Sequence, residues 1–218
     1  MSSSIDRLRA AWHFFLNGWR DWDQTASFIP SSRFLVDALV EGADLQRALR
    51  VIELGTGTGT VTEKLLAAMR PDARLYGVEI DGGLIAATAR RLPDPRLVPI
   101  HGSAADLEQL LARAGCDGPI DAIVSCLGMS LLPPDVRDAI TESAARVLAR
   151  GGVFVQYGYL HARVVVYSTT RGFSRFHLGR HLGRYFSEQR RQIVVPNLPP
   201  AEVLVCRGSL ESPLPAAA

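Results

Sequence analysis

Short apolar runs along the middle of the chain alternate with longer segments of helical periodicity. The runs predict buried strands at 51–54, 74–79, 97–100, 122–125 and 153–157, and the segments between them predict helices at 60–69, 83–91, 104–113 and 134–148. Strands and helices that alternate in this rhythm are typical of a mostly parallel sheet with helices on both faces. The predicted fold class is therefore α/β, in which ligands bind at the carboxyl ends of the strands.

Two further β-rich runs come near the C-terminus, at 192–195 and 202–206, and a proline-rich turn joins them. They predict a hairpin with a reversed strand at one edge of the sheet, which brings the expected sheet to seven strands. The residues after them are rich in Pro and Ala, so a disordered tail is expected over 211–218. The main domain is expected over 28–210.

The first 27 residues contain one apolar stripe at helical spacing. Six residues follow alternating steps of three and four along it: Ile5, Leu8, Trp12, Phe15, Trp19 and Trp22. Because Trp favours boundaries between apolar and aqueous surroundings, the stripe predicts an amphipathic helix over 1–27 that contacts a membrane surface through Trp12, Phe15 and Trp19. The stripe also fits a helix packed on the domain or on a dimer partner, and the two interpretations are compatible.

A proline follows this first helix and predicts its end. Beyond Pro30, Ser31 or Ser32 is a suitable N-cap for a second helix that runs from Arg33 to about residue 41. Alternatively, the same turn closes over a ligand from the N-terminal side.

Composition limits the classes of function. The 218 residues, 47% hydrophobic and 21% charged, fit one soluble globular domain with appendages. No run approaches the roughly 18 uninterrupted apolar residues of a membrane span, and no secretory signal is expected. Cys116, Cys126 and Cys206 lack C-x-x-C spacing, which predicts reduced thiols in the cytoplasm. His177 and His181 have ligand-like spacing without an evident third ligand, so no metal is expected.

Positive charge is concentrated in the segment 160–191, although the formal net charge of the chain is only +2. Seven arginines stand there against a single acid, Glu188. If the segment is helical, its four-residue repeat makes a basic stripe. Arg163, Arg180 and Arg184 would then contact an anionic membrane surface or hold a substrate phosphate. The alternative is a solvated charged helix.

A glycine-rich loop follows the first strand. Gly55, Gly57 and Gly59 stand at alternate positions after Glu53. Glycine tolerates positive φ and lets the backbone approach a ligand closely, and the helix beyond the loop offers unpaired N–H groups. A dinucleotide fingerprint would need glycine at position 60, where the chain has Thr60.

The loop resembles the first motif of S-adenosylmethionine (SAM)-dependent methyltransferases, in which it wraps the amino-acid end of the cofactor. In that family an acidic residue at the end of the next strand holds the ribose hydroxyls, and Glu79 stands at this position. The resemblance implies a Rossmann-like fold and SAM as cofactor, with the product S-adenosylhomocysteine.

A more specific resemblance is to the bacterial phospholipid N-methyltransferases, which methylate phosphatidylethanolamine. Five motifs that span most of residues 28–207 carry it: Ile-Pro-Ser-Ser-Arg at 29–33, the loop at 53–59, Ile-Val-Ser-Cys-Leu at 123–127, Gly-Val-Phe-Val-Gln-Tyr at 152–157 and Asn-Leu-Pro-Pro-Ala at 197–201. The resemblance implies transfer of up to three methyl groups to the lipid amine, giving phosphatidylcholine. It also implies a peripheral protein on the inner face of the membrane. The oligomeric state stays open.

The resemblance and the strand ends together indicate the cofactor contacts. They are Ser31, Ser32, Glu53, Gly55, Thr56, Gly57, Gly59, Glu79, Ile80, Gly102, Ser103, Ala104, Ser125, Cys126 and Leu127. Ser103 stands where many relatives have an aspartate near the adenine, and Gly128 replaces an expected proline. The segment 160–191 does not align, so the head-group selectivity stays open.

Three residues beyond the fifth strand are candidates for catalysis. An ammonium must lose a proton before its nitrogen can attack a methyl group. Tyr157 and Tyr159 are expected near the reacting methyl, where aromatic faces would hold a cationic nitrogen. His161 is a possible proton acceptor. The alternative for each tyrosine is a packing role.

Other acceptors fit the same motifs. Ribosomal RNA adenine dimethyltransferases carry an Asn-Ile/Leu-Pro-Tyr-type sequence after the fourth strand, whereas residues 125–128 are Ser-Cys-Leu-Gly here. Asn197 opens a similar sequence but lies near the last strand. We therefore expect no nucleic-acid partner. The alternative acceptors are another amino-lipid such as ornithine lipid and, less favoured, an rRNA adenine or a small molecule. A SAM-binding membrane protein without activity is a further alternative.

Overall fold

The computed structural model describes residues 31–164, 166–168, 172–197 and 199–210. The predicted helix over 1–27, with Trp12, Phe15 and Trp19, and the predicted tail over 211–218 lie outside the described residues. In the described part of the chain, no helix is long and apolar enough to cross a membrane.

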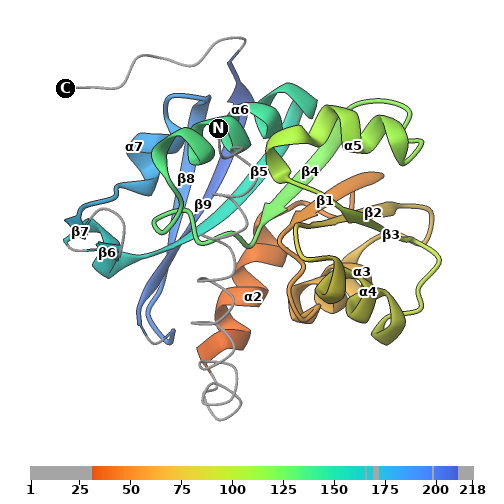
Figure 1. Ribbon diagram of the computed structural model, residues 1–218, viewed down its shortest axis with the longest axis horizontal. Coiled ribbons are helices and arrows are strands. Elements are labelled where there is room, and N and C mark those ends of the chain that lie inside the picture. Colours follow the sequence, from red (N-terminus) through yellow and green to blue (C-terminus); the bar gives the residue numbers. More distant parts are fainter. Residues whose placement is uncertain (1–30, 165, 169–171, 198, 211–218) are drawn as a thin grey trace, which may run out of the picture.

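A seven-stranded sheet forms the centre of the molecule (Figure 1). Its strands in chain order are β1 (Arg50–Leu54), β2 (Arg74–Glu79), β3 (Leu97–His101), β4 (Ile120–Ser125), β5 (Leu148–Tyr159), β8 (Phe186–Val194) and β9 (Ala201–Ser209). They lie in the order β3-β2-β1-β4-β5-β9-β8. β1 to β5 are parallel, and β9 runs antiparallel between β5 and β8. The predicted α/β class and the mostly parallel seven-stranded sheet are confirmed.

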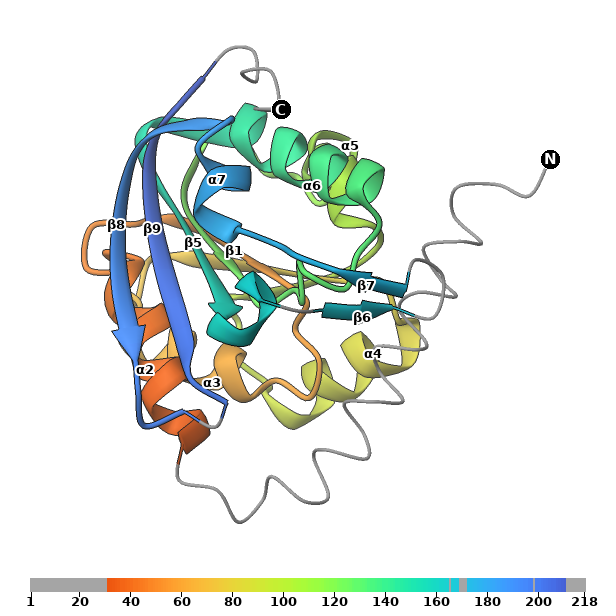
Figure 2. The ribbon, with the colours of Figure 1, turned by 90° about the vertical axis from the view of Figure 1, so that its left-hand side faces the viewer.

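Helices cover both faces of this sheet (Figure 2). One face carries α2 (Ser31–Gly42), α3 (Thr60–Ala68) and α4 (Gly82–Arg91), and the other carries α5 (Leu107–Arg113), α6 (Pro134–Val147) and α7 (Leu178–Leu182). Side chains alternate along each strand, so β1 buries Val51 on the α2 side and Ile52 on the α6 side. Two separate apolar cores fix the register of the strands.

The chain changes direction across the sheet after β3. β2 and β3 lie on one side of β1, and β4 and β5 lie on the other. Ligands of open α/β sheets bind at such a switch point, outside the carboxyl ends of the strands. The order of the strands therefore places the candidate site over the ends of β1 and β4.

The basic segment is not one helix. It contains the short 3-10 helix η2 (Leu160–Arg163), the small hairpin of β6 (Val166–Ser168) and β7 (Gly172–Ser174), the five-residue helix α7 and the first part of β8. The predicted basic stripe at i, i+4 is therefore not formed. The helix predicted at 104–113 instead begins with a 3-10 turn, η1 (Ala104–Asp106), before α5. The predicted edge hairpin is confirmed, with both strands longer than expected.

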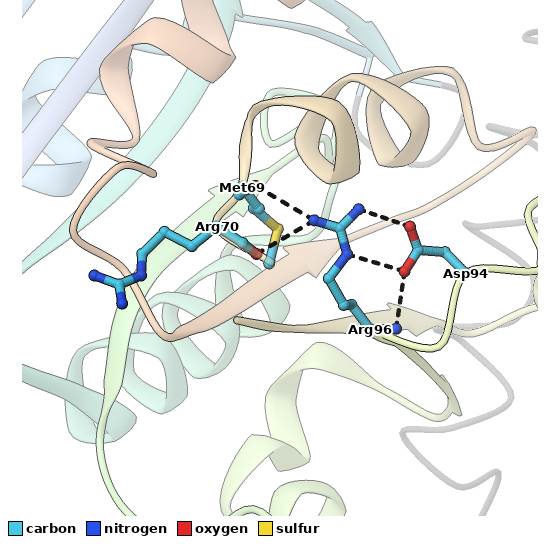
Figure 3. Close-up of polar contacts among 4 residues, drawn as sticks. All are labelled: Met69, Arg70, Asp94 and Arg96. Carbon is cyan, nitrogen blue, oxygen red and sulfur yellow. Dashed lines mark hydrogen bonds and ion pairs between the residues drawn. The ribbon is translucent and has the colours of Figure 1, made fainter. Parts of the chain in front are cut away.

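An arginine holds the end of α3 against the turn that precedes β3 (Figure 3). Arg96 donates from Nε and Nη2 to the carboxylate of Asp94, at 3.0 and 2.7 Å. Its Nη1 donates to the carbonyl oxygens of Met69 and Arg70, both at 3.3 Å. Met69 is the C-cap of α3 and Arg70 follows it, so this guanidinium ties the end of α3 to the turn at Asp94.

Candidate functional site

The loop between β1 and α3 depends on glycine at three positions. Gly55, Gly57 and Gly59 have φ angles of 79°, 50° and 85°, in the left-handed region. A Cβ on Gly59 would come within 2.7 Å of the Arg91 guanidinium and 2.9 Å of Thr88. A Cβ on Gly57 would meet nothing within 4 Å. Gly59 is thus required for packing on α4, and Gly57 leaves its backbone open for a ligand to approach.

The carboxylate at the end of β2 shapes this loop. Glu79 accepts a hydrogen bond from the backbone N–H of Gly57 at 3.0 Å and another from Asp81 at 3.0 Å. The Thr88 hydroxyl donates to the Gly57 carbonyl at 3.0 Å. Burial raises the pKa of Glu79, and the two N–H groups oppose that rise. The loop conformation is thereby tied to the residue predicted to hold the ribose.

Glu53 lies at the end of β1 and is completely buried. Among the residues that the structure describes, neither of its carboxylate oxygens has a hydrogen-bond partner. Burial raises the pKa of Glu53 to about 8. The hydroxyl and backbone N–H of Thr62 lie near enough to oppose the rise, although neither makes a hydrogen bond of good geometry to the carboxylate, and the charge of Glu79 adds to the rise. A buried carboxyl without a partner is costly, so its presence points to a ligand that pairs with it.

Other unpaired polar atoms gather at the same place. Within the described part of the chain, seven buried side-chain oxygens have no hydrogen-bond partner: both of Glu53 and those of Thr56, Thr62, Ser125, Gln156 and Tyr157. They lie at or beyond the ends of the adjacent strands β1, β4 and β5 and in the loop and helix that follow β1. Carboxylate and hydroxyl oxygens accept hydrogen bonds, and Glu53 can supply a negative charge, so the cluster suits a ligand with N–H donors and positive charge.

A cleft lies along the ends of β2 and β3. It encloses about 400 Å³, part of it open to solvent, and its lining includes Gly55, Glu79, Gly102, Ser103 and Leu127. The predicted contacts Ile80 and Ala104 line it as well. The Ser103 hydroxyl accepts a hydrogen bond from the N–H of Ala105 at 3.2 Å and so caps η1. The cleft is apolar between its polar ends, as a nucleoside site requires.

The residues predicted after the fourth strand close the site from the other side. Ser125 and Leu127 are buried, and Cys126 is partly exposed. Burial raises the pKa of the Cys126 thiol well above its usual value, and the charges of Glu53 and Glu79 add to the rise. The Cys126 N–H donates to the carbonyl of Leu54 at 2.8 Å, which holds this turn against β1. For Ser31 and Ser32 the structure gives only the backbone, in the first turn of α2.

The three predicted catalytic residues form a series that leads from the interior to the surface. The rings of Tyr157 and Tyr159 meet edge to face at 5.5 Å, and Tyr159 stacks on His161 at 5.6 Å. Tyr157 is buried, Tyr159 is partly buried and His161 is exposed. Burial raises the pKa of Tyr159 to about 12 and that of Tyr157 well above 10, so both phenols stay protonated near neutral pH.

The three predicted arginine contacts differ in their surroundings. Arg163 bonds to the buried Glu202, and Arg184 bonds to Asp138 on α6 at 3.0 Å. Arg180 is exposed on α7. No cluster of three or more potential metal ligands occurs among the residues that the structure describes.

Two functional candidates escaped the sequence analysis. The Gln156 amide donates to the carbonyls of Leu127 and Tyr157, at 2.9 and 2.8 Å, and so fixes the turn after β4. Glu202 is a buried carboxylate paired with two arginines. A polar residue inside an apolar strand run is the signal that could have drawn attention to both.

Comparisons with known proteins agree with this site. Residues 51–152 match the family described as a methyltransferase domain. The chain is 29% identical over 188 residues to the ornithine lipid N-methyltransferase of Singulisphaera acidiphila. The aligned region covers 86% of this chain and 90% of that protein. The chain is 38% identical over 135 residues to ribosomal RNA small subunit methyltransferase A of Parasynechococcus marenigrum, covering 54% and 44% of the two chains.

Solved structures share the fold. The N-methyltransferase NodS of Bradyrhizobium japonicum superposes with a TM-score of 0.66 at 15% identity, over 83% of this chain and 98% of that one. The O-methyltransferase TomG of Streptomyces achromogenes, solved in complex with SAM, superposes with a TM-score of 0.60 at 20% identity, over 80% of each chain.

The polar cluster and the cleft fit SAM. The unpaired oxygens of Glu53 and its neighbours suit the ammonium and sulfonium charges of that cofactor, and the cleft beyond Glu79 suits its nucleoside. The predicted cofactor and the predicted enzyme class are therefore confirmed. The protein is a SAM-dependent methyltransferase with the Rossmann-like class I fold.

Proposed function

We propose that this enzyme methylates the head-group amine of a membrane amino-lipid, with ornithine lipid as the first candidate acceptor. The observation that carries the proposal is the similarity to an ornithine lipid N-methyltransferase along most of both chains. Phosphatidylethanolamine, which the sequence motifs favour, is the second candidate. Both lipids present a primary amine and an anionic group at a bilayer surface, so one site architecture suits either.

The residues of this chain bind and orient the reactants. When bound, SAM supplies an electrophilic methyl group that a neutral amine displaces in line. Glu53 pairs with positive charge on the cofactor, Glu79 holds its ribose and the Gly57 backbone leaves room for its amino-acid end. Alignment of this kind supplies most of the rate enhancement that such a transfer needs.

The amine must be neutral before it reacts. Tyr157 has a buried hydroxyl without a hydrogen-bond partner among the described residues, and it accepts the amine N–H as an orienting group. Tyr159 and His161 continue from it toward solvent, and the imidazole accepts the departing proton at the surface. The aromatic faces then hold the methylated, cationic nitrogen.

The test is an acceptor comparison. The full chain is incubated with radiolabelled SAM and, separately, with neutral vesicles that contain ornithine lipid or phosphatidylethanolamine and with small-subunit ribosomal RNA. We expect label in the lipid extract, with ornithine lipid the faster acceptor, and none in the RNA.

Label in the RNA with none in either lipid would replace the lipid assignment by RNA methylation. Phosphatidylethanolamine as the faster lipid would keep the amino-lipid class and reverse the order of acceptors. A reaction with the same protein and an excess of unlabelled S-adenosylhomocysteine serves as the negative control.

A further inference from the structure

A buried carboxylate near the start of β9 holds two arginines from different elements. Glu202 is 1% exposed. Arg163 of η2 binds it through two nitrogens: Nε lies 3.2 Å from Oε1, and Nη2 bonds Oε2. Arg191 of β8 approaches from the other side, with its Nε 2.8 Å from Oε2. We call these three residues the Arg–Glu–Arg cluster.

The cluster carries a net charge of +1. The single carboxylate of Glu202 balances one of the two guanidinium groups. Arg163 uses its planar fork on Glu202, whereas Arg191 uses only Nε. The Arg191 side chain is 43% exposed, so its terminal N–H donors are accessible to a ligand. The cluster therefore presents a fixed fork of N–H donors, which suits a phosphate or carboxylate.

The strand register places this fork beside the catalytic strand. Glu202 is paired with Gly158 of β5 on one side and with Ile193 of β8 on the other. Adjacent strands lie about 4.8 Å apart, so Glu202 is one strand from the segment that carries Tyr157 and Tyr159, with its side chain on the α6 face of the sheet and theirs on the α2 face. Glu202 also lines a small hollow together with Tyr157, Tyr159 and Gly128. β5, β9 and β8 lie side by side in Figure 2.

Exposed aliphatic side chains border the cluster. Val164 directly follows Arg163 and is 69% exposed. Ile193 and Val195 follow Arg191 on the same strand end and are 42% and 69% exposed. Cationic donors next to exposed aliphatic groups match the boundary between the head groups and the acyl chains of a lipid.

We propose that the Arg–Glu–Arg cluster is the anion subsite of the acceptor: Arg191, held in place by Glu202, binds the anionic group of the lipid head group while the amine reaches the end of β5. This inference rests on the proposed amino-lipid function. The shared chemistry is an oxyanion several bonds from a primary amine, namely the phosphate of phosphatidylethanolamine or the carboxylate of ornithine lipid. Arg191 and Glu202 thereby become specificity residues that the sequence motifs did not indicate.

The experiment compares acceptors with and without an anion. The Arg191→Gln variant removes the accessible donors but leaves Glu202 paired with Arg163, so the fold is kept and thermal unfolding checks this. Arg190→Gln is the matched control: it removes the same charge one residue away, on the α2 side of the sheet, beside Glu41 and Asp44. Each protein is assayed on ornithine lipid, on phosphatidylethanolamine and on a long-chain primary alkylamine, all in neutral vesicles.

We expect Arg191→Gln to raise the KM for at least one zwitterionic lipid about tenfold, as loss of a charge-assisted contact does, and to leave the KM for the alkylamine unchanged. The lipid affected identifies the anion as phosphate or carboxylate. Arg190→Gln should leave the KM for the lipids and the KM for the alkylamine unchanged. Equal effects of the two variants, equal effects on lipid and alkylamine, or no effect of Arg191→Gln would overturn the subsite while leaving the lipid activity of the wild type in place. A wild type inactive on both lipids would overturn the proposed function, and this inference with it.

Discussion

Glu53 makes the free enzyme less stable than it could be, because its carboxyl group is buried beside Glu79 without a hydrogen-bond partner among the described residues. Its pKa of about 8 lies above the usual 4.5. Between about pH 4.5 and pH 8, the folded protein therefore keeps a proton on Glu53 that the unfolded chain has lost. Stability should therefore fall as the pH rises through this window. The residue that we propose to pair with the cofactor is thus also a source of instability in the free protein.

The Glu53→Gln variant tests this at the residue scale. At pH 8.5 we expect it to be more stable than the wild type by about 1–3 kcal/mol, since a neutral amide is less costly to bury. At pH 5 the two proteins should unfold at similar temperatures. S-adenosylhomocysteine should bind the variant at least about tenfold more weakly, because an ionic hydrogen bond is lost. A variant that is less stable than the wild type at pH 8.5, measured by calorimetry, would contradict this account.

Gly57 and Gly115 form a matched pair for a second test. Both have positive φ, at 50° and 68°, and a Cβ on either would meet nothing within 4 Å. Substitution by Ala should therefore cost each variant about 1 kcal/mol of stability from backbone strain alone. Only Gly57→Ala should also lose cofactor affinity, because only its Cβ would occupy ligand space. Isothermal titration calorimetry with S-adenosylhomocysteine measures the affinity of each variant. Equal affinities of the two variants would show that Gly57 does not face the cofactor.

The positions of the glycine loop and of its neighbouring carboxylates could be predicted from the sequence because they depend on local structure. Glu53, the glycines and Glu79 lie at strand ends and in a turn, which spacing reveals. Gln156 and Glu202 could not be assigned in this way. Their roles depend on partners 29 and 39 residues away, Leu127 and Arg163, which only the assembled sheet brings near.

At the scale of elements, α7 is docked on α6 through a buried histidine. His181 lies 2.9 Å from the Thr141 hydroxyl, which itself donates to the Arg137 carbonyl at 2.8 Å. The hydroxyl therefore accepts from Nε2–H of the imidazole, and Nδ1 faces Asp138 at 3.5 Å. Burial lowers the pKa of His181 to about 4, with Arg137 and Arg184 contributing and Asp138 opposing. The neutral imidazole thus joins two elements that are far apart in the chain.

This contact makes the docking of α7 sensitive to acid. In the unfolded chain His181 binds a proton below about pH 6.5, whereas in the folded protein it does so only near pH 4. The free energy of unfolding should therefore fall as the pH falls through this window, by up to about 3 kcal/mol. The His181→Gln variant should lack this contribution to the pH dependence. The His177→Gln variant, altered at an exposed position, should keep it. The measurement is the slope of unfolding free energy against pH from 6.5 to 4.5, and identical slopes for both variants would refute the assignment.

The core elements could be predicted because apolar runs mark strands that are buried on both faces. The edge of the sheet was harder. In β8 the five consecutive residues 187–191 are all exposed. The strand therefore lacks the alternation of buried and exposed residues that reveals a half-buried strand. Charged residues on an edge strand oppose pairing with other chains, which explains the pattern physically. A run of charged residues of this kind is also compatible with a helix, which is the possibility that the sequence raises for the segment 160–191.

At the scale of the whole molecule, the aromatic stripe in the first 27 residues gives the remaining prediction. Replacement of Trp12, Phe15 and Trp19 by Ser should abolish sedimentation with anionic vesicles, because the apolar face of the predicted helix is lost. Affinity for S-adenosylhomocysteine should stay nearly unchanged, since every predicted cofactor contact lies beyond residue 30. Vesicle binding equal to that of the wild type would assign membrane contact elsewhere, with Val164, Ile193 and Val195 as the first candidates.

The position of β9 between β5 and β8 has a consequence for biosynthesis. β8 precedes β9 in the chain but has no other neighbour in the described sheet, so during translation it emerges without a strand to pair with. Glu202, which organises both arginines, emerges later still. The nascent chain can therefore form β1 to β4, which carry most of the predicted cofactor contacts, well before Glu202 is made. Ribosome-bound intermediates should accordingly gain cofactor affinity before they gain the ability to select a substrate.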